Sequence, residues 1–354
     1  MCSMTKINKR IEIVSSAHLG LSSMSWPSRQ AIEVVLAKHY VDVRITIINS
    51  LTDLEALVIR QPDLVFLGME CLLADQTLGL LGSNKIWLAE YLDEQGIAYT
   101  GSSQRAIEIS RDKSLAKQVI REAGLNTAPF WVVGRNQLLV MDQLSIPFPL
   151  FVKPVSRGGG AGIDSDSVVY DFEHLKAKVL SIAVKHRSDS LIEEYLPGRE
   201  FSVAILKSEI SAGYSVMPIE LIAQPDEHGR RLLGRQAKLD DFEQAIAITD
   251  QTIKSQISSL ALGVFSALTA RDFARIDIRI DKSGNPQFLE ANPIPCLIGG
   301  YGSFHKACLI NLNMDYESMI LSIVRLAMDR QGQIIGDLSQ PIYADNFLPA
   351  LGII

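Results

Sequence analysis

The feature that most constrains this fold is a regular alternation of strand and helix patterns over the first hundred residues. Short apolar runs typical of strands alternate with helix patterns, in the order strand 11–14, helix 28–38, strand 41–48, helix 52–60, strand 64–67, helix 83–94 and strand 97–100. Strands and helices that alternate at this spacing form parallel sheets with helices on both faces. The N-terminal part therefore predicts a doubly wound α/β sheet, with a ligand crevice at the strand ends.

The pattern changes after residue 108, and the length of 354 residues favours two or three domains. Ser110 is positioned to cap a helix over 111–123. The later elements expected are strands at 148–152, 190–195, 200–206, 212–222, 273–281 and 287–292, and helices at 250–270 and 315–330. The polar segment 224–243 predicts a mobile loop, and the tail 331–354 has no assignment.

Composition excludes several classes of protein. Hydrophobic content of 47% and charged content of 21% are typical of a folded globular chain. A net charge of −6 without a long Lys/Arg run argues against nucleic acid as a partner. No apolar run reaches the ~18 residues of a membrane span. The N-terminus lacks a signal-peptide pattern, and four scattered cysteines suit a reducing compartment, so we expect a cytoplasmic protein with small-molecule partners.

Two strands that flank the turn DKSGNP carry the most informative pattern. Apolar and charged residues alternate along FARIDIRID (273–281), and Glu290 and Asn292 share a face in QFLEAN (287–292). If the turn closes a hairpin that pairs Asp281 with Pro286, Asp277 falls opposite Glu290. Side chains opposed in this way lie ~5 Å apart at Cβ, where two carboxylates repel each other unless a cation lies between them.

The same register places Arg275 opposite Asn292. Mg²⁺ takes oxygen ligands and is commonly held by one or two carboxylates together with substrate phosphates. Asp277, Glu290 and the amide oxygen of Asn292 form such a ligand set. A solvated hairpin face with ordinary salt bridges is the alternative interpretation.

The segment SRGGGAG (156–162) follows Lys153 at the end of an apolar strand. Glycines let backbone N–H groups close around phosphate oxygens, and a lysine adds a point charge. Three consecutive glycines carry this pattern, namely Gly158, Gly159 and Gly160. Lys113 lies in the first turn of a predicted helix, where the helix dipole disfavours a cation unless an anion is near. A plain turn and a surface lysine are the alternatives.

The segment LIEEYLPGREFSV places acidic residues where one strand ends and the next begins. Glu193 and Glu194 could accept hydrogen bonds from a bound nucleoside, as could Glu200, with Leu196 against the base. An acidic loop without a ligand is the alternative.

These segments occur in the order and spacing of the ATP-grasp superfamily, and the chain most resembles its D-alanine–D-alanine ligase branch. The resemblance is carried by IAYTGSS (97–103), SRDKSLAKQVIREAGLNTAPF (110–130), PLFVKPVSRGGGAGI (149–163), IEEYLPGREFSVAIL (192–206), ARIDIRID (274–281) and FLEANPIP (288–295). It implies an N-terminal domain over 1–108, a central ATP-grasp lid subdomain over 109–195 and a C-terminal ATP-grasp subdomain over 196–354.

The resemblance also implies residue roles and a reaction. The phosphates of ATP would be bound by Lys113, Lys153 and the glycine segment, adenine by Glu193, Glu194 and Leu196, ribose by Glu200, Mg²⁺ or Mn²⁺ by Asp277, Glu290 and Asn292, and the transferred phosphoryl group by Arg275. A carboxylate would attack the γ-phosphate, and an amine would displace phosphate from the acyl phosphate. Amino acids are the expected substrates, and relatives of this type are commonly homodimers.

The segments implied to bind substrate depart from the branch. The stretch 17–30 contains no acidic residue, where these ligases place a glutamate. Their His-Gly segment is replaced by GMECLLAD (68–75), and Cys296 replaces a glycine near the reaction centre. Near 220–224 there is no counterpart of their Lys-Tyr pair. A ligase for another acid, a nucleotide-binding protein without ligase activity and a kinase-like member of the fold therefore stay open. Cys296 is expected to be a small buried residue beside the site.

Overall fold

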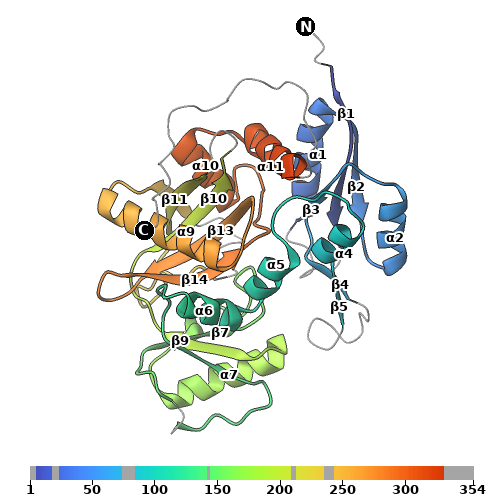
Figure 1. Ribbon diagram of the computed structural model, residues 1–354. Helices are drawn as coiled ribbons and strands as arrows, with labels where there is room; N and C mark the ends of the chain where they lie inside the picture. The colour runs from blue at the N-terminus through green and yellow to red at the C-terminus, as the bar shows by residue number, and fades with distance from the viewer. Residues whose placement is uncertain are drawn as a thin grey trace.

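The computed structural model describes residues 5–17, 24–73, 84–141, 144–208, 213–234 and 243–330 (Figure 1). The tail 331–354 lies outside the described residues, as do parts of the segments 17–30, 68–75 and 224–243 named above.

The N-terminal strands form the parallel sheet that the alternation predicts. β1 (Ile7–Ser15) lies between β2 (Tyr40–Ile47) and β3 (Leu64–Leu67), and both pairings are parallel. Two helices connect these strands, α1 (Trp26–His39) and α2 (Leu51–Ile59). α2 begins with a capping box, in which Ser50 Oγ accepts from Asp53 N and the Asp53 carboxylate accepts from Ser50 N.

Two expectations for the following segment are wrong in part. The predicted strand 97–100 is reduced to an isolated parallel bridge between Tyr99 and Val65. The predicted helix 83–94 starts later, at α4 (Leu88–Glu94), because the residues before it form β5 (Lys85–Trp87), antiparallel to β4 (Cys71–Leu73).

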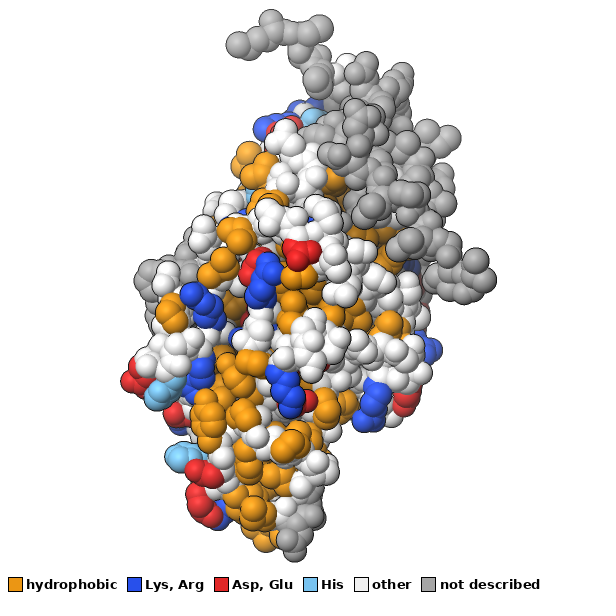
Figure 2. All heavy atoms as spheres, turned by 90° about the vertical axis from the view of Figure 1, so that its left-hand side faces the viewer, with side chains coloured by type: hydrophobic (Ala, Val, Ile, Leu, Met, Phe, Trp, Pro, Cys, Tyr) orange, Lys and Arg blue, Asp and Glu red, His pale blue; other side chains and the backbone are white. Residues whose placement is uncertain are grey.

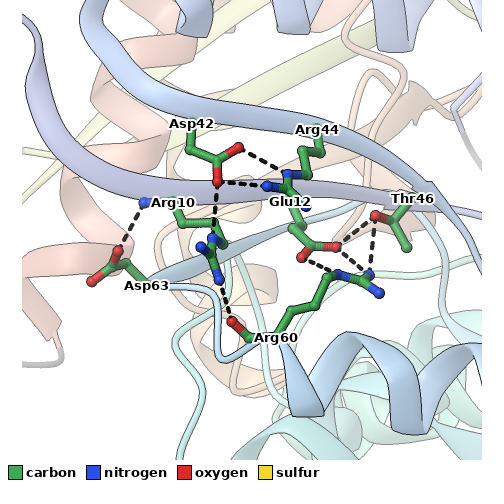
Figure 3. Close-up of polar contacts among 7 residues, drawn as sticks. All are labelled: Arg10, Glu12, Asp42, Arg44, Thr46, Arg60 and Asp63. Carbon is green, nitrogen blue, oxygen red and sulfur yellow. Dashed lines mark hydrogen bonds and ion pairs between the residues drawn. The ribbon is translucent and has the colours of Figure 1, made fainter.

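A charged network crosses this sheet (Figure 3). Glu12 in β1 is fully buried and accepts two hydrogen bonds from the Arg60 guanidinium, at 2.7 and 2.6 Å. Thr46 donates to the same carboxylate at 2.6 Å. Arg10 links the network to Asp42 through its Nε atom at 2.9 Å. Buried charges are tolerated only when they are paired in this way.

The second sheet, which we call the lid sheet, is antiparallel with the order β6-β9-β7-β8. Its strands are β6 (Phe130–Val133), β7 (Leu150–Pro154), β8 (Val168–Val169) and β9 (Ser190–Glu194). α7 (Phe172–His186) packs on it through Leu175, Val179 and Ile182. The lid sheet and α7 lie at the bottom of the view in Figure 2, where hydrophobic side chains gather on the surface.

The third sheet, which we call the base sheet, is antiparallel with the order β12-β11-β10-β13-β14. Its strands are β10 (Glu200–Lys207), β11 (Tyr214–Ile222), β12 (Gln244–Ala247), β13 (Phe273–Ile280) and β14 (Pro286–Asn292). Val203 and Ile276 face the helix α9 (Gln251–Ala267) on one side. Ala204 and Met217 belong to the core on the other side, which includes residues of α10 (Ser303–Leu312).

Helices join the sheets. α11 (Tyr316–Arg330) is the last described helix, and its Met319 and Ile323 share a core with Ile11 and Phe66 of the N-terminal sheet (Figure 1). Among the described residues, no helix is both long enough and apolar enough to cross a bilayer.

The expected cap of the helix at 111–123 is wrong. Ser110 belongs to the preceding helix α5 (Gln104–Arg111), and α6 (Lys113–Glu122) is capped by Asp112, which accepts from Ser114 N at 2.9 Å and Leu115 N at 3.0 Å. Asp112 replaces Ser110 because its carboxylate reaches two N–H groups of the first turn.

Candidate active site

The register of the β13–β14 hairpin is confirmed where it matters for the site. Asp277 pairs with Glu290 and Arg275 with Asn292. The predicted pairing at the turn is wrong, because Pro286 lies opposite Ile280 and not Asp281.

A bulge between Asp277 and Ile278 explains why one end of the hairpin agrees and the other does not. On β14 the register passes from Glu290 directly to Phe288, so Leu289 is the extra residue. The bulge also turns two consecutive side chains, Leu289 and Glu290, toward the same cleft.

Side chains from β10, β13 and β14 contact the Asp277 carboxylate. Its side chain accepts from Arg275 Nε at 3.0 Å and Arg275 Nη2 at 2.8 Å, and from Ser202 Oγ at 2.8 Å. Asn292 Nδ2 lies 3.4 Å from the same carboxylate. Burial alone would lower the pKa of Arg275, but Asp277 and then Glu290 raise it above its ordinary value. Arg275 and Asn292 both contact the Asp277 carboxylate, which lines the cleft.

Lys113 connects the glycine segment to the second carboxylate. It is the first residue of α6, and it is buried. Its Nζ donates to the carbonyl of Arg157 at 2.6 Å and lies 3.3 Å from Glu290 Oε2. The expectation that this lysine faces an anionic group is therefore met, in part, by Glu290.

A buried cluster of three charges lies on the lid side of the cleft. Lys153 Nζ lies 2.6 Å from Glu193 Oε1, and Lys117 Nζ lies 2.8 Å from Glu193 Oε2. Lys117 is fully buried and also donates to Thr127 Oγ1 at 2.7 Å. Burial alone would raise the pKa of Glu193, but the two ammonium groups outweigh burial and hold that pKa below its ordinary value.

The cleft between the lid and base sheets contains about 740 Å³ of space not filled by atoms, open to solvent. Nine of the residues predicted from the sequence line it, namely Lys113, Lys153, Gly160, Glu193, Glu194, Leu196, Glu200, Asp277 and Glu290. Gly158 and Gly159 belong to the same loop but do not line the cleft. The fold therefore brings predicted site residues from positions 113 to 290 together around one cavity.

The glycine loop adopts a backbone that other residues rarely adopt. Gly159, Gly160 and Gly162 have φ values of +64°, +74° and +79°. A Cβ atom at Gly162 would lie 2.6 Å from Pro154 Cγ. The loop is held at its start by Arg157, whose Nη2 donates to the carbonyl of His186 at 2.6 Å.

Sequence reasoning missed eight residues that line the cleft, which are Phe151, Arg157, Ile163, Tyr195, Leu232, Leu233, Arg279 and Leu289. A signal existed for Arg279, because the alternation along β13 places it on the same face as Asp277. Leu289 enters only through the bulge, which no pattern indicated. Leu232 and Leu233 lie in a segment that was expected to be a mobile loop.

Comparisons with known proteins identify the family of this chain. A family model described as D-ala D-ala ligase C-terminus matches residues 119–325, more than half of the chain. The uncharacterized protein y4sG of Sinorhizobium fredii is 31% identical over 246 residues, which cover 68% of this chain and 69% of that protein. The D-alanine–D-alanine ligase of Glaesserella parasuis is 30% identical over 251 residues, covering 70% and 78%.

Solved structures confirm the predicted fold class. The D-alanine–D-alanine ligase from Bacillus anthracis complexed with ATP superposes with a TM-score of 0.71 at 19% identity, covering 92% of this chain and 99% of that chain. The ligase from Coxiella burnetii gives a TM-score of 0.63 at 15% identity, covering 92% and 95%. With the family match and the relatives, the chain belongs to the D-alanine–D-alanine ligase family of ATP-grasp enzymes, which are ATP-dependent, ADP-forming carbon–nitrogen ligases.

Proposed function

We propose that this protein joins a small carboxylate to an amine through an acyl phosphate, and that the cleft between the lid and base sheets binds ATP. The observation that carries the proposal is the direct opposition of Asp277 and Glu290 on neighbouring strands, in the same cleft as Lys113 and Lys153. Two carboxylates beside two lysines suit a bound nucleoside triphosphate with a divalent ion.

The donor set fits Mg²⁺ or Mn²⁺. Carboxylate oxygens of Asp277 and Glu290 and the amide oxygen of Asn292 are the hard oxygen ligands that these ions prefer. Arg275 and Ser202 already orient the Asp277 carboxylate. When bound, the ion would neutralise charge on the phosphates and on the transferred phosphoryl group.

The lysines and Arg275 supply positive charge for phosphoryl transfer. Lys113 and Lys153 would bind phosphate oxygens, with backbone N–H groups of the loop Gly158–Gly160. Arg275, held against Asp277, would face the phosphoryl group as the carboxylate attacks it. Phosphoryl transfer depends mainly on positioning and charge stabilisation, and these residues provide both. The loop 156–162 would also exclude water, which hydrolyses an acyl phosphate.

The nucleoside would lie toward the apolar end of the cleft. Glu194 and Leu196 are proposed to contact adenine, and Glu200 the ribose. Glu193 was expected to bind adenine as well, but its two carboxylate oxygens lie against Lys117 and Lys153. We propose that Glu193 contributes to nucleotide binding mainly by placing Lys153.

The substrates are proposed to be a small carboxylate and an amine, with amino acids as the first candidates. D-Alanine is one candidate among several, because the stretch 17–30 has no acidic residue and Cys296 replaces a glycine. The three larger sheets support a division into domains at 1–108, 109–195 and 196–354. We also propose that the protein forms a homodimer and is located in the cytoplasm.

Release of ADP and phosphate from ATP, measured across a panel of carboxylates and amines with Mg²⁺, tests this function. ADP formation should require a carboxylate and should produce an amide when an amine is present. Asp277→Ala and Glu290→Ala should abolish turnover, while Glu173→Ala, on the exposed face of α7, should not. Normal turnover by the first two variants would refute the metal assignment. ATP binding without carboxylate-dependent ADP formation would indicate a binding protein, and phosphate transfer with no amine step would indicate a kinase.

A further inference from the structure

Arg279 lies in the cleft beside the carboxylate that is proposed to bind ribose. Its strand position on β13 is directly opposite Glu200 on β10, and the next pair on the same face is Asp277 opposite Ser202. Both Arg279 and Glu200 line the cleft, and Arg279 is only 8% exposed. A buried arginine at this position needs acceptors for its N–H groups.

Three acceptors from separate segments hold the Arg279 guanidinium. Nη1 donates to Glu200 Oε2 at 2.9 Å, Nε to the carbonyl of Gly198 at 3.1 Å, and Nη2 to the carbonyl of Arg231 at 2.9 Å. The Arg279 Cζ atom also lies 6.0 Å from the centre of the Tyr195 ring. A planar guanidinium bound at three edges is rigid, so it holds its carboxylate partner in one orientation.

We infer that Arg279 is a positioning residue that orients Glu200 toward the ribose hydroxyls and so sets the preference for ribonucleotides over deoxyribonucleotides. The inference rests on the proposed function, because it takes the cleft to bind ATP. A carboxylate near a triphosphate is electrostatically unfavourable unless a cation compensates it, and Arg279 supplies that cation at 2.9 Å. The oriented carboxylate can then accept a hydrogen bond from a hydroxyl group.

The contact with Arg231 extends this role to the wall of the cleft. Leu232 and Leu233 follow Arg231 directly and line the cleft. Arg279 therefore fixes two parts of one subsite, the carboxylate from the base sheet and the apolar wall from the segment after β11. A residue that only stabilised the fold would affect ATP and its deoxy analogues equally.

Calorimetric binding of ATP, 2′-deoxy-ATP and 3′-deoxy-ATP with Mg²⁺ tests the inference without knowledge of the acid or the amine. A hydrogen bond from a hydroxyl to a charged group is worth roughly 10- to 100-fold in affinity, so the wild-type protein should bind at least one deoxy nucleotide that much more weakly than ATP. Arg279→Met should reduce this ratio to below roughly threefold. Arg279→Lys keeps the charge but not the three-way geometry, and it should restore only part of the ratio.

The matched control is Arg199→Met. Arg199 directly precedes β10 and forms an ion pair with Glu220, at 2.5 Å. Its loss should leave the ratio unchanged. Glu200→Gln should lower the ratio of ATP affinity to deoxynucleotide affinity as Arg279→Met does. If Arg279→Met does not fold, Glu200→Gln and Arg279→Lys together test the inference. The inference would be overturned if the Arg279 variants kept the wild-type preference for ATP over the deoxy nucleotides, or if the wild type bound all three nucleotides equally. Absence of any ATP binding would instead refute the proposed function.

Discussion

Lys153 Nζ and Glu193 Oε1 lie 2.6 Å apart inside the cleft, and the second carboxylate oxygen of Glu193 is held by Lys117. The three side chains together carry one net positive charge. Lys117 thereby compensates Glu193 and leaves the charge of Lys153 available to an anion. Without Lys117, Lys153 and Glu193 would form a neutral pair.

Lys117→Met should therefore weaken both stability and nucleotide binding. Glu193 keeps Lys153 as its cation, but its second carboxylate oxygen and Thr127 lose their charged donor, which costs about 2 kcal/mol. The free energy of unfolding measured with urea should fall by that amount. ATP affinity should fall roughly tenfold, because one charge near the phosphates is lost. Lys176→Met, on the exposed face of α7, is the control. Unchanged stability of Lys117→Met would contradict the role given to this cluster.

The same cluster predicts how stability depends on pH. The folded-state pKa of Glu193 lies below its ordinary value of 4.5. Below that value the unfolded chain binds more protons than the folded chain, so the contribution of Glu193 is present above 4.5 and is lost as pH falls through the folded pKa. Glu193→Gln should remove this contribution. Urea unfolding at a series of pH values should give the variant a shallower acid dependence than the wild type, and parallel curves would contradict the assignment.

Substitution of either opposed carboxylate should change the requirement for a divalent ion. Asp277→Asn and Glu290→Gln each remove a charged oxygen ligand, and the Mg²⁺ concentration at half-maximal ADP release should rise at least about tenfold. Asp277→Asn should also destabilise the fold, by about 2 kcal/mol, because Arg275 loses its charged partner. Titration of Mg²⁺ and Mn²⁺ against ADP release checks this, with Glu173→Gln as the control. An unchanged requirement in both variants would contradict the metal site.

The buried network of the N-terminal sheet predicts a stability effect without a role in the cleft (Figure 3). Arg60→Leu leaves the fully buried Glu12 without its cation and should lower the free energy of unfolding by about 3 kcal/mol. The double variant Glu12→Leu/Arg60→Leu should recover most of that loss, because no buried charge is left unpaired. Arg44→Leu removes an exposed partner of Asp42 and should have little effect. Equal losses in the single and double variants would contradict the pairing.

Alternation and turn length were sufficient to predict the register of Asp277 and Glu290, although they placed the turn one residue away from its true pairing. The Leu289 bulge absorbs that difference, and nothing in the local pattern indicates a bulge. The lysines and the glycine loop could be predicted because they lie at or directly after the ends of predicted strands and helices. The contact of Lys117 with Glu193 could not, because it joins residues 76 positions apart on different elements.

The partners of Arg279 show the same limit. Alternation places its side chain on the charged face of β13, but its bonds to Gly198 and Arg231 depend on how distant loops pack. Local periodicity reports which face a residue occupies. Which side chains meet across a cleft depends on packing between sheets, and that information is spread over the whole chain.

The most direct test follows oxygen from the carboxylate substrate, labelled with oxygen-18, into the released phosphate. The substrate is the acid that most increases ADP release in the panel. If its carboxylate attacks the γ-phosphate and the amine then displaces phosphate, each phosphate released should carry one labelled oxygen, as measured by mass spectrometry. Unlabelled phosphate, with the label retained in the acid or amide, would contradict an acyl phosphate and with it the proposed reaction.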